Sequence, residues 1–319
     1  MQFNNSLFAF PNIEATLDRQ PLIISPDTSL KETIALMCQI RRTNRHLRLE
    51  NSKVTPSRAA SCALVMDDGE IKGIITERDI VKSTASGISL TECKVANVMS
   101  HPVITLKEEN LKDIFATLFT FRRYKIRHLP LIDNNNRLIG IISPETIRQA
   151  MRPANLLKLR RIADVMQRNV ITADVTASVL EIARLMTQNR ISCVVITRED
   201  LENETVIPVG IITERDIMQF QFLELNLAQT MAEEVMSTPL FLMNPEDSLL
   251  VANKEMTSRR IRRLVVSWNW GRNLGIVTQT SLLKIFDPME MYNVIESLQH
   301  TVQQLEQENK ELKRRIQNG

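Results

Sequence analysis

The sequence has little of what membrane proteins and nucleic-acid-binding proteins display. No stretch approaches the ~20 uncharged apolar residues that a membrane-spanning helix requires. The 319 residues carry 40 basic and 37 acidic side chains, a net charge of only +3. This balance gives no reason to expect a nucleic acid or a membrane surface as a partner. The first ten residues also lack the basic start and apolar core of a secretory signal. We therefore expect a cytoplasmic protein without a membrane span.

Signatures of catalysis and of metal binding are missing as well. The four cysteines form no C-x-x-C pair, and Cys62 and Cys193 precede apolar runs that are typical of buried strands. The four histidines are scattered, and the sequence has no Walker loop, no H-E-x-x-H and no nucleophile elbow. We therefore expect no catalytic residue, no metal and no cofactor, so that binding is the function that remains.

What the sequence does contain is a repeated octapeptide. Gly-Ile-Ile-Thr-Glu-Arg-Asp-Ile occurs at Gly73–Ile80 and again, unchanged, at Gly210–Ile217, with degenerate copies at Gly140–Ile147 and Gly275–Leu282. The glycines of the four copies are 67, 70 and 65 residues apart. A near-constant period of this length indicates an array of one structural unit. The chain is therefore predicted to consist of four repeats and two additional ends.

Each unchanged copy predicts a strand followed by a helix. A glycine before a β-branched run is typical of a strand that leaves a tight turn, and Thr76 or Thr213 then occupies a helix N-cap. Asp79 and Asp216 follow three residues later, on the same face as the hydroxyl. One interpretation is a capping motif, in which the acid bonds to the backbone of the N-cap. The other is a ligand site, because the N–H groups of the first turn suit an anion.

The octapeptide occurs in units opened by a Val-Met pair, at Val98-Met99, Val165-Met166 and Val235-Met236. In motif, order and spacing the chain resembles the cystathionine β-synthase (CBS) domain over roughly residues 21–286. The resemblance implies an α/β (α+β) fold of four CBS repeats, each β-α-β-β-α. It also implies that the repeats pair into two Bateman modules, which bind adenosine nucleotides in the clefts between paired repeats.

The predicted boundaries place two modules between an N-terminal arm and a C-terminal helix. They are an arm at 1–20, module 1 at 21–151 (repeats 1 and 2 at 21–86 and 96–151), a linker at 152–162, module 2 at 163–286 (repeats 3 and 4 at 163–222 and 232–286), and a coiled-coil helix at 288–319. In repeat 1 we expect a helix at 29–40. The basic segment 41–60 that follows is interpreted as a solvated loop, with a loop folded over a phosphate as the alternative. In repeat 2 we expect a strand at 102–105 and a helix at 111–121.

Acidic and basic residues alternate between the repeats at two positions. The last place of Thr-x-x-Asp is acidic in repeats 1 and 3 only, whereas the start of the middle strand is basic in repeats 2 and 4 only. The residues at the first position are Asp79, Thr146, Asp216 and Ser281, and those at the second are Ser61-Cys62, Arg127-His128, Ser192-Cys193 and Arg262-Arg263.

A nucleotide needs both kinds of group, because a carboxylate can accept hydrogen bonds from ribose hydroxyls while phosphate needs cations and N–H donors. If paired repeats face each other, each module has one composite site, and the mirror-image site without an acid is weak or empty. The alternative is that the cations lie on strand surfaces facing solvent. The predicted ligand-binding residues are Thr76, Asp79, Arg127 and His128 in module 1, and Thr213, Asp216, Arg262 and Arg263 in module 2.

The segment Tyr124–Asp133 is similar to one in the γ subunit of AMP-activated protein kinase. This resemblance implies that Asp79 and Asp216 hold ribose and that the Arg/His pairs hold the phosphate of AMP, ADP or ATP, with the phosphate count left open. The favoured function is a regulatory nucleotide sensor that passes occupancy to an output domain after Gly319, as in the sensory regions of bacterial signalling proteins. The alternative is a scaffold or dimerisation module that binds no ligand.

The C-terminal segment has a heptad pattern. Apolar residues and one Asn alternate steps of four and three at Met291, Ile295, Leu298, Val302, Leu305, Asn309, Leu312 and Ile316. β-Branched residues at position a with Leu at d favour a parallel two-stranded coiled coil. We therefore expect a homodimer formed through residues 291–316, with a single amphipathic helix packed on its own modules as the alternative.

Overall fold

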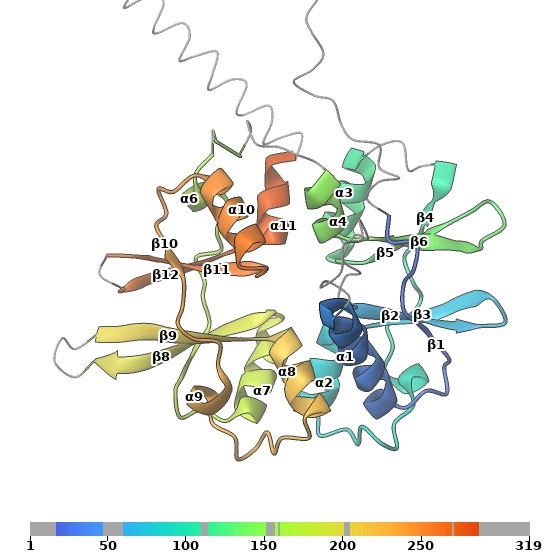
Figure 1. Ribbon diagram of the computed structural model, residues 1–319, viewed down its shortest axis with the longest axis horizontal. Helices are drawn as coiled ribbons and strands as arrows, with labels where there is room; N and C mark the ends of the chain where they lie inside the picture. The colour runs from blue at the N-terminus through green and yellow to red at the C-terminus, as the bar shows by residue number, and fades with distance from the viewer. Residues whose placement is uncertain are drawn as a thin grey trace, which may run out of the picture.

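The computed structural model describes residues 17–46, 60–109, 114–150, 157–158, 160–200, 205–269 and 271–286. Each repeat contains one three-stranded sheet, and the four sheets surround a common centre (Figure 1). In every sheet the first strand runs parallel to the second, and the second pairs antiparallel with the third. The predicted α/β fold of four repeats is therefore confirmed.

Strands and helices follow one order in every repeat, a short strand, a helix, a hairpin and a second helix. Repeats 1 and 2 contain β1 (Ile23–Ile24), α1 (Leu30–His46), β2 (Cys62–Asp67), β3 (Glu70–Thr76), α2 (Glu77–Ala85), the 3-10 turn η4 (Val95–Asn97), β4 (Leu106–Lys107), α3 (Ile114–Tyr124), β5 (Leu129–Ile132), β6 (Leu138–Ile142) and α4 (Pro144–Ala150). Repeats 3 and 4 contain α6 (Ile162–Val165), β7 (Thr172–Asp174), α7 (Val179–Asn189), β8 (Cys193–Asp200), β9 (Thr205–Thr213), α8 (Glu214–Phe222), α9 (Ala232–Val235), β10 (Leu242–Met243), α10 (Leu249–Ser258), β11 (Arg263–Trp268), β12 (Asn273–Thr278), α11 (Gln279–Leu282) and η6 (Leu283–Phe286).

A segment at the start of each repeat crosses to the sheet of its neighbour and pairs with the third strand there. The four crossings join Asp18 to Ile141, Ser100 to Ile74, Gln167 to Ile276 and Ser237 to Ile211. Each is held by backbone hydrogen bonds, for example from the Ile74 N–H to the Ser100 carbonyl at 3.1 Å. Repeats 1 and 2 therefore exchange segments with each other, as do repeats 3 and 4, and these exchanges define the two modules.

The crossings also connect the two sequence markers of the repeat. A Cβ atom on Gly73 would lie 2.2 Å from the Met99 sulfur, and one on Gly210 would lie 2.2 Å from the Met236 sulfur. These separations are far below a normal carbon–sulfur contact, so only glycine lets the crossing segment lie against the strand. The octapeptide glycine and the Val-Met pair are therefore the two sides of one contact.

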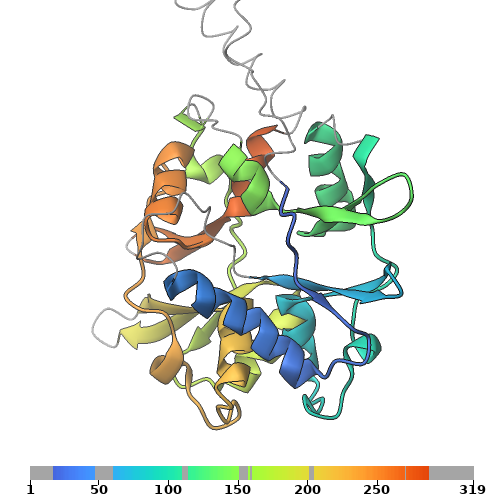
Figure 2. The same ribbon diagram turned by 45° about the vertical axis from the view of Figure 1, so that its right-hand side comes forward.

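The modules pack against each other through helices. In repeat 1, α1 and α2 contact α7 and α8 of repeat 3, and α4 of repeat 2 contacts α11 of repeat 4 (Figures 1 and 2). Val81 of α2 belongs to the apolar core of repeat 3, and Met218 of α8 belongs to that of repeat 1. Repeats 2 and 4 share a further core. The apolar cores therefore run across the module boundary.

Three local predictions were wrong. The first helix continues past Ile40 to His46, because no Gly or Pro follows that could end it. The helix expected at 111–121 extends to Tyr124 and ends where Lys125 adopts a positive φ of 53°. The strand expected at 102–105 is instead β4, at Leu106–Lys107. Residues 100–105 lie in the crossing between sheets, and Pro102 has no N–H for a ladder.

Several predictions fall outside the described residues. These are the coiled-coil helix at 288–319, residues 1–16 of the arm, most of the linker and the remainder of the basic segment after His46. Within the described ranges, no helix is both long enough and apolar enough to cross a membrane.

Candidate functional site

The residues that precede the middle strand of each repeat come together at the centre of the molecule. Ser61 and Ser192 stand before β2 and β8, and Arg127-His128 and Arg262-Arg263 stand at the start of β5 and β11. All of them line one cavity of about 330 Å³. A volume of this size is typical of small-molecule sites.

The cavity receives residues from all four repeats. In module 2 it is bounded by Asn169, Asn189 and Ser192 of repeat 3 and by Thr278 and Gln279 of repeat 4. On this side of module 2 the helix α11 is capped by Thr278 and has Ser281 in place of the acid. The binding site on this side was expected above to be weak or empty. The Ser281 N–H donates to Thr278 Oγ1 at 3.1 Å, so a hydroxyl pair serves as the cap here.

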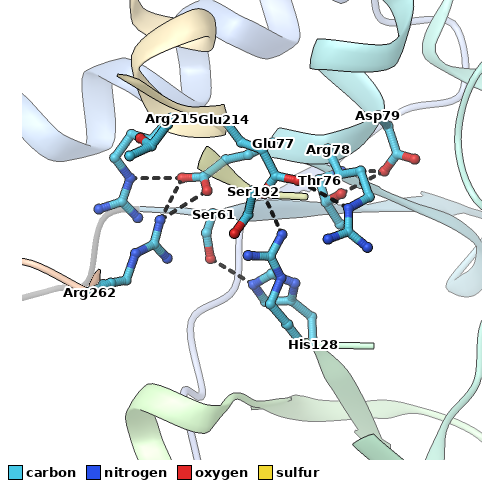
Figure 3. A network of polar contacts seen from close by, with 12 residues as sticks. Ser61, Thr76, Glu77, Arg78, Asp79, His128, Ser192, Glu214, Arg215 and Arg262 are labelled. Carbon is cyan, nitrogen blue, oxygen red and sulfur yellow. Dashed lines mark hydrogen bonds and ion pairs between the residues drawn. The ribbon is translucent and has the colours of Figure 1, made fainter. Parts of the chain in front are cut away.

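Two glutamates and four arginines form a central cluster beside the cavity (Figure 3). Arg215 Nε donates to Glu77 Oε1 at 2.8 Å, and Arg262 Nη2 lies 2.9 and 3.1 Å from the two carboxylate oxygens of Glu77. The same arrangement recurs around Glu214, with Arg78 Nε at 3.0 Å and Arg127 Nη2 at 2.5 Å. We call Glu77, Glu214, Arg78, Arg127, Arg215 and Arg262 the central cluster.

Every ion pair of this cluster crosses the module boundary. Glu77 belongs to module 1 and both of its arginines belong to module 2, whereas Glu214 belongs to module 2 and both of its arginines belong to module 1. The glutamate side chains are only 3% and 1% exposed, whereas their arginine partners are partly exposed, from 20% for Arg215 to 45% for Arg78. The central cluster therefore joins the two modules electrostatically.

Burial and the arginines act in opposite directions on the two carboxyl groups. Burial alone raises a carboxyl pKa, but Arg262 and Arg215 more than offset it and hold the pKa of Glu77 well below its usual range. For Glu214, Arg127 and Arg78 outweigh burial and likewise lower the pKa. Both glutamates are therefore ionised at neutral pH, and four guanidinium groups face two carboxylates.

The remaining predicted cations contact serines within their own module. The Ser61 hydroxyl lies 2.6 Å from His128 Nε2, and Arg263 Nε donates to Ser192 Oγ at 3.1 Å. Burial, reinforced by the charge of Arg127, lowers the pKa of His128 to about 3. His128 is therefore neutral at pH 7, and Arg263 adds a further positive charge to the cavity wall.

The neutral state of His128 predicts a specific pH dependence of stability. An unfolded histidine gains a proton near pH 6.5 whereas the folded one does not until about pH 3, so the unfolded state binds more protons between these values. Stability attributable to His128 is therefore lost as the pH falls, by about 1.4 kcal/mol per pH unit. From pH 7 to pH 5 the wild type should lose about 2 kcal/mol more than His128→Asn in urea unfolding. Parallel pH profiles for the two proteins would show that His128 titrates normally.

The predicted threonine–aspartate pairs lie at the helix starts but do not line the cavity. Asp79 Oδ2 accepts hydrogen bonds from the Thr76 N–H and hydroxyl, both at 2.8 Å, and Asp216 Oδ2 does the same with Thr213 at 2.8 Å. Asp79 Oδ1 also accepts from Ser100 Oγ at 3.2 Å. These bonds are those of the capping interpretation. Of the eight predicted residues, the four at the middle strands, Arg127, His128, Arg262 and Arg263, line the cavity.

Sequence reasoning missed Glu77, Arg78, Glu214 and Arg215, which are the Glu-Arg dipeptide of the two unchanged octapeptides. The sequence analysis assigned a role only to the threonine and the aspartate on either side of that dipeptide. A signal was nevertheless present, because Glu-Arg occurs only in repeats 1 and 3, as the acid of Thr-x-x-Asp does, while repeats 2 and 4 have Pro144-Glu145 and Gln279-Thr280 at the same places.

Comparison with known proteins identifies the repeats. The model of the CBS domain family matches residues 13–86, 95–153, 162–222 and 232–287. The crystal structure of MJ1225 from Methanocaldococcus jannaschii, described as a candidate archaeal homologue of γ-AMPK, superposes with a TM-score of 0.68 at 22% identity, covering 86% of this chain and 99% of that one. A conserved protein of unknown role from Pyrococcus horikoshii has a TM-score of 0.54 at 15% identity, covering 86% and 98%.

Sequence similarity to curated relatives covers shorter stretches. MK0525 from Methanopyrus kandleri is 34% identical over 125 residues, which is 39% of this chain and 61% of that protein. MJ1225 is 28% identical over 168 residues, 49% of this chain and 57% of its own length. The chain thus spans a little more than half of the length of these two relatives. The solved structures, at these identities, establish the fold.

Proposed function

The chain belongs to the CBS-domain family, and on that premise we propose that it is a regulatory sensor of adenosine nucleotides that binds their phosphate in the central cavity. The observation that carries the proposal is the position of the cations. Arg127, Arg262 and Arg263 come from two modules and line one cavity of about 330 Å³. The planar guanidinium group of arginine is well suited to binding phosphate, because it can donate two or more hydrogen bonds to the phosphate oxygens at once.

We assign the ribose of the nucleotide to the threonine–aspartate pairs at the helix starts. Thr76 with Asp79 and Thr213 with Asp216 are proposed to hold ribose, since a carboxylate that already bonds one hydroxyl has lone pairs for others. AMP, ADP and ATP are all candidate ligands. The role is regulatory rather than catalytic. An output domain after Gly319 and a homodimer formed through residues 291–316 belong to the same proposal.

A ligand-free scaffold is the second candidate, and one observation favours it. The arginines of the central cluster already bond to Glu77 and Glu214, so the centre does not need an added anion to be stable. Isothermal titration calorimetry of the whole chain with adenosine, AMP, ADP and ATP separates the two candidates. A sensor binds at least one nucleotide more tightly than adenosine, whereas a scaffold shows no heat of binding at millimolar concentration.

Arg263 provides the sharpest variant for this test, because it donates a hydrogen bond to the Ser192 hydroxyl and does not belong to the central cluster. Arg263→Ala should weaken AMP binding by about 1.5–3 kcal/mol, the contribution of a charged hydrogen bond, and leave adenosine affinity unchanged. Arg259→Ala is the matched control, since Arg259 lies over Phe241 in the same repeat and outside the cavity lining. Equal losses for adenosine and AMP would show that Arg263 does not read phosphate.

A further inference from the structure

We propose that Glu77 and Glu214 are built-in counter-anions that a ligand phosphate must displace, so that nucleotide binding exchanges one anion for another and replaces two of the ion pairs between the modules. This inference rests on the proposed function. It adds how the sensor distinguishes a nucleotide from a nucleoside and how ligand occupancy changes the contacts between the modules. It concerns two residues that belong to the unchanged octapeptide and not to the predicted ligand set.

The first step of the argument is the geometry of the pairing. Arg262 Nη2 lies 2.9 and 3.1 Å from both oxygens of Glu77, and Arg127 Nη2 lies 2.5 Å from Glu214. Both arginines also line the cavity. A carboxylate and a phosphate compete for the same guanidinium N–H groups, since each can accept two N–H···O bonds from one guanidinium through a pair of its oxygens. These arginines can therefore take a phosphate only if they give up part of their contact with the glutamates.

The second step is charge. Four arginines of the central cluster face two carboxylates, and Arg263 stands at the same wall. A phosphate monoester brings about two negative charges, so it can satisfy Arg127 and Arg262 in place of the glutamates. Each glutamate keeps a second arginine partner, Arg215 for Glu77 and Arg78 for Glu214. The displaced carboxylates thus remain paired and stay buried at low cost.

The third step is the consequence for the modules. The Glu77–Arg262 and Glu214–Arg127 pairs both cross the module boundary. Exchange with phosphate removes these two links, and the phosphate joins the same arginines directly to each other. Adenosine, which has no phosphate, leaves both links in place. The phosphate group, and not the nucleoside, therefore changes the ion pairs between the modules. This change gives the sensor a way to transmit ligand binding to other parts of the protein.

The glutamates consequently set the affinity for phosphate, and removing their charge should raise it. Glu77→Gln and Glu214→Gln keep the size of the side chain and remove the competing anion. Each should bind AMP about tenfold more tightly than the wild type, the effect of losing one competing charged hydrogen bond. Adenosine affinity should change less than twofold. Glu255→Gln is the matched control, because Glu255 pairs with Arg259 on the outer helix α10, and it should alter neither affinity.

The measurement is calorimetry of the whole chain with AMP and with adenosine. Unchanged or weaker AMP binding in both glutamine variants overturns the inference, while binding of AMP by the wild type leaves the proposed function standing. Absence of binding of either ligand to the wild type overturns both together. The two failures are therefore distinguishable.

A second measurement uses only the wild type and decides the matter if the variants do not fold. Backbone hydrogen exchange is followed in α2 and α8, whose first residues are Glu77 and Glu214. Saturating AMP should change the exchange rates of these first turns relative to saturating adenosine. The same rates with both ligands would mean that phosphate does not reach the inter-module pairs.

Discussion

Replacing Glu214 by alanine is expected to lower the free energy of unfolding by about 3 kcal/mol, the lower end of the range for breaking a buried ion pair, because it leaves Arg127, whose side chain is only 28% exposed, without its counter-charge. The side chain of Glu214 is 1% exposed and bonds to Arg78 and Arg127 of the other module. Replacing all members of such an ion pair by apolar residues of similar size would not necessarily lower the stability. Removal of one partner is costly because the remaining charges stay in a poorly solvated site.

Urea unfolding in a buffer without phosphate or sulfate measures this loss. Glu255→Ala serves as the control, since its partner Arg259 is 47% exposed and a pair of this kind contributes about 0.3–0.5 kcal/mol. Added inorganic phosphate should restore part of the stability of Glu214→Ala and have less effect on the wild type. A loss no larger than that of Glu255→Ala would mean that the central pairs are solvated.

Met218→Ala should have the second large effect and should also uncouple the modules. Met218 is fully buried on α8 and packs in the apolar core that contains Ile34, Met37 and Ile80 of repeat 1. Large-to-small changes of this kind cost about 2–5 kcal/mol, and here the cavity lies between modules. Leu30→Ala is the matched control, because Leu30 is equally buried but packs in a core whose members all belong to module 1.

The two variants are distinguished by the shape of the unfolding transition. Both tryptophans of the chain lie in repeat 4, so their fluorescence reports module 2, whereas circular dichroism reports the whole chain. In Met218→Ala the two probes should give separate transitions, while in Leu30→Ala and in the wild type they should coincide. Coincident transitions in Met218→Ala would show that the junction does not depend on this contact.

Structural features that recur at a constant spacing, or that depend only on residues close together in the chain, were predictable from the sequence. The spacing of Gly73, Gly140, Gly210 and Gly275 gave the four repeats, because one glycine in each unit must accept a close crossing segment. The hydrogen bond between Thr76 and Asp79 was anticipated by the capping interpretation, the alternative to the predicted ligand site, because a cap involves residues only three apart. The alternation of serines and basic residues before the middle strands also identified the four basic residues that line the cavity.

Features that depend on docking of the two modules were not predictable. Glu77 and Arg262 are 185 residues apart and Arg127 and Glu214 are 87 apart. No local pattern joins residues at such distances, and the pairing follows only once repeats 1 and 3 lie side by side. The composite site was sought within each module for the same reason, whereas the charged contacts of Arg127 and Arg262 run between modules.

The central claim is that a nucleotide phosphate takes the place of the glutamates at Arg127 and Arg262. A crystal structure of the whole chain with AMP tests it most directly. The account predicts the phosphate within hydrogen-bond distance of Arg127 or Arg262, Arg263 beside it, and the corresponding glutamate carboxylate moved toward Arg78 or Arg215. A nucleotide bound elsewhere, with the Glu77–Arg262 and Glu214–Arg127 pairs both intact, would contradict it.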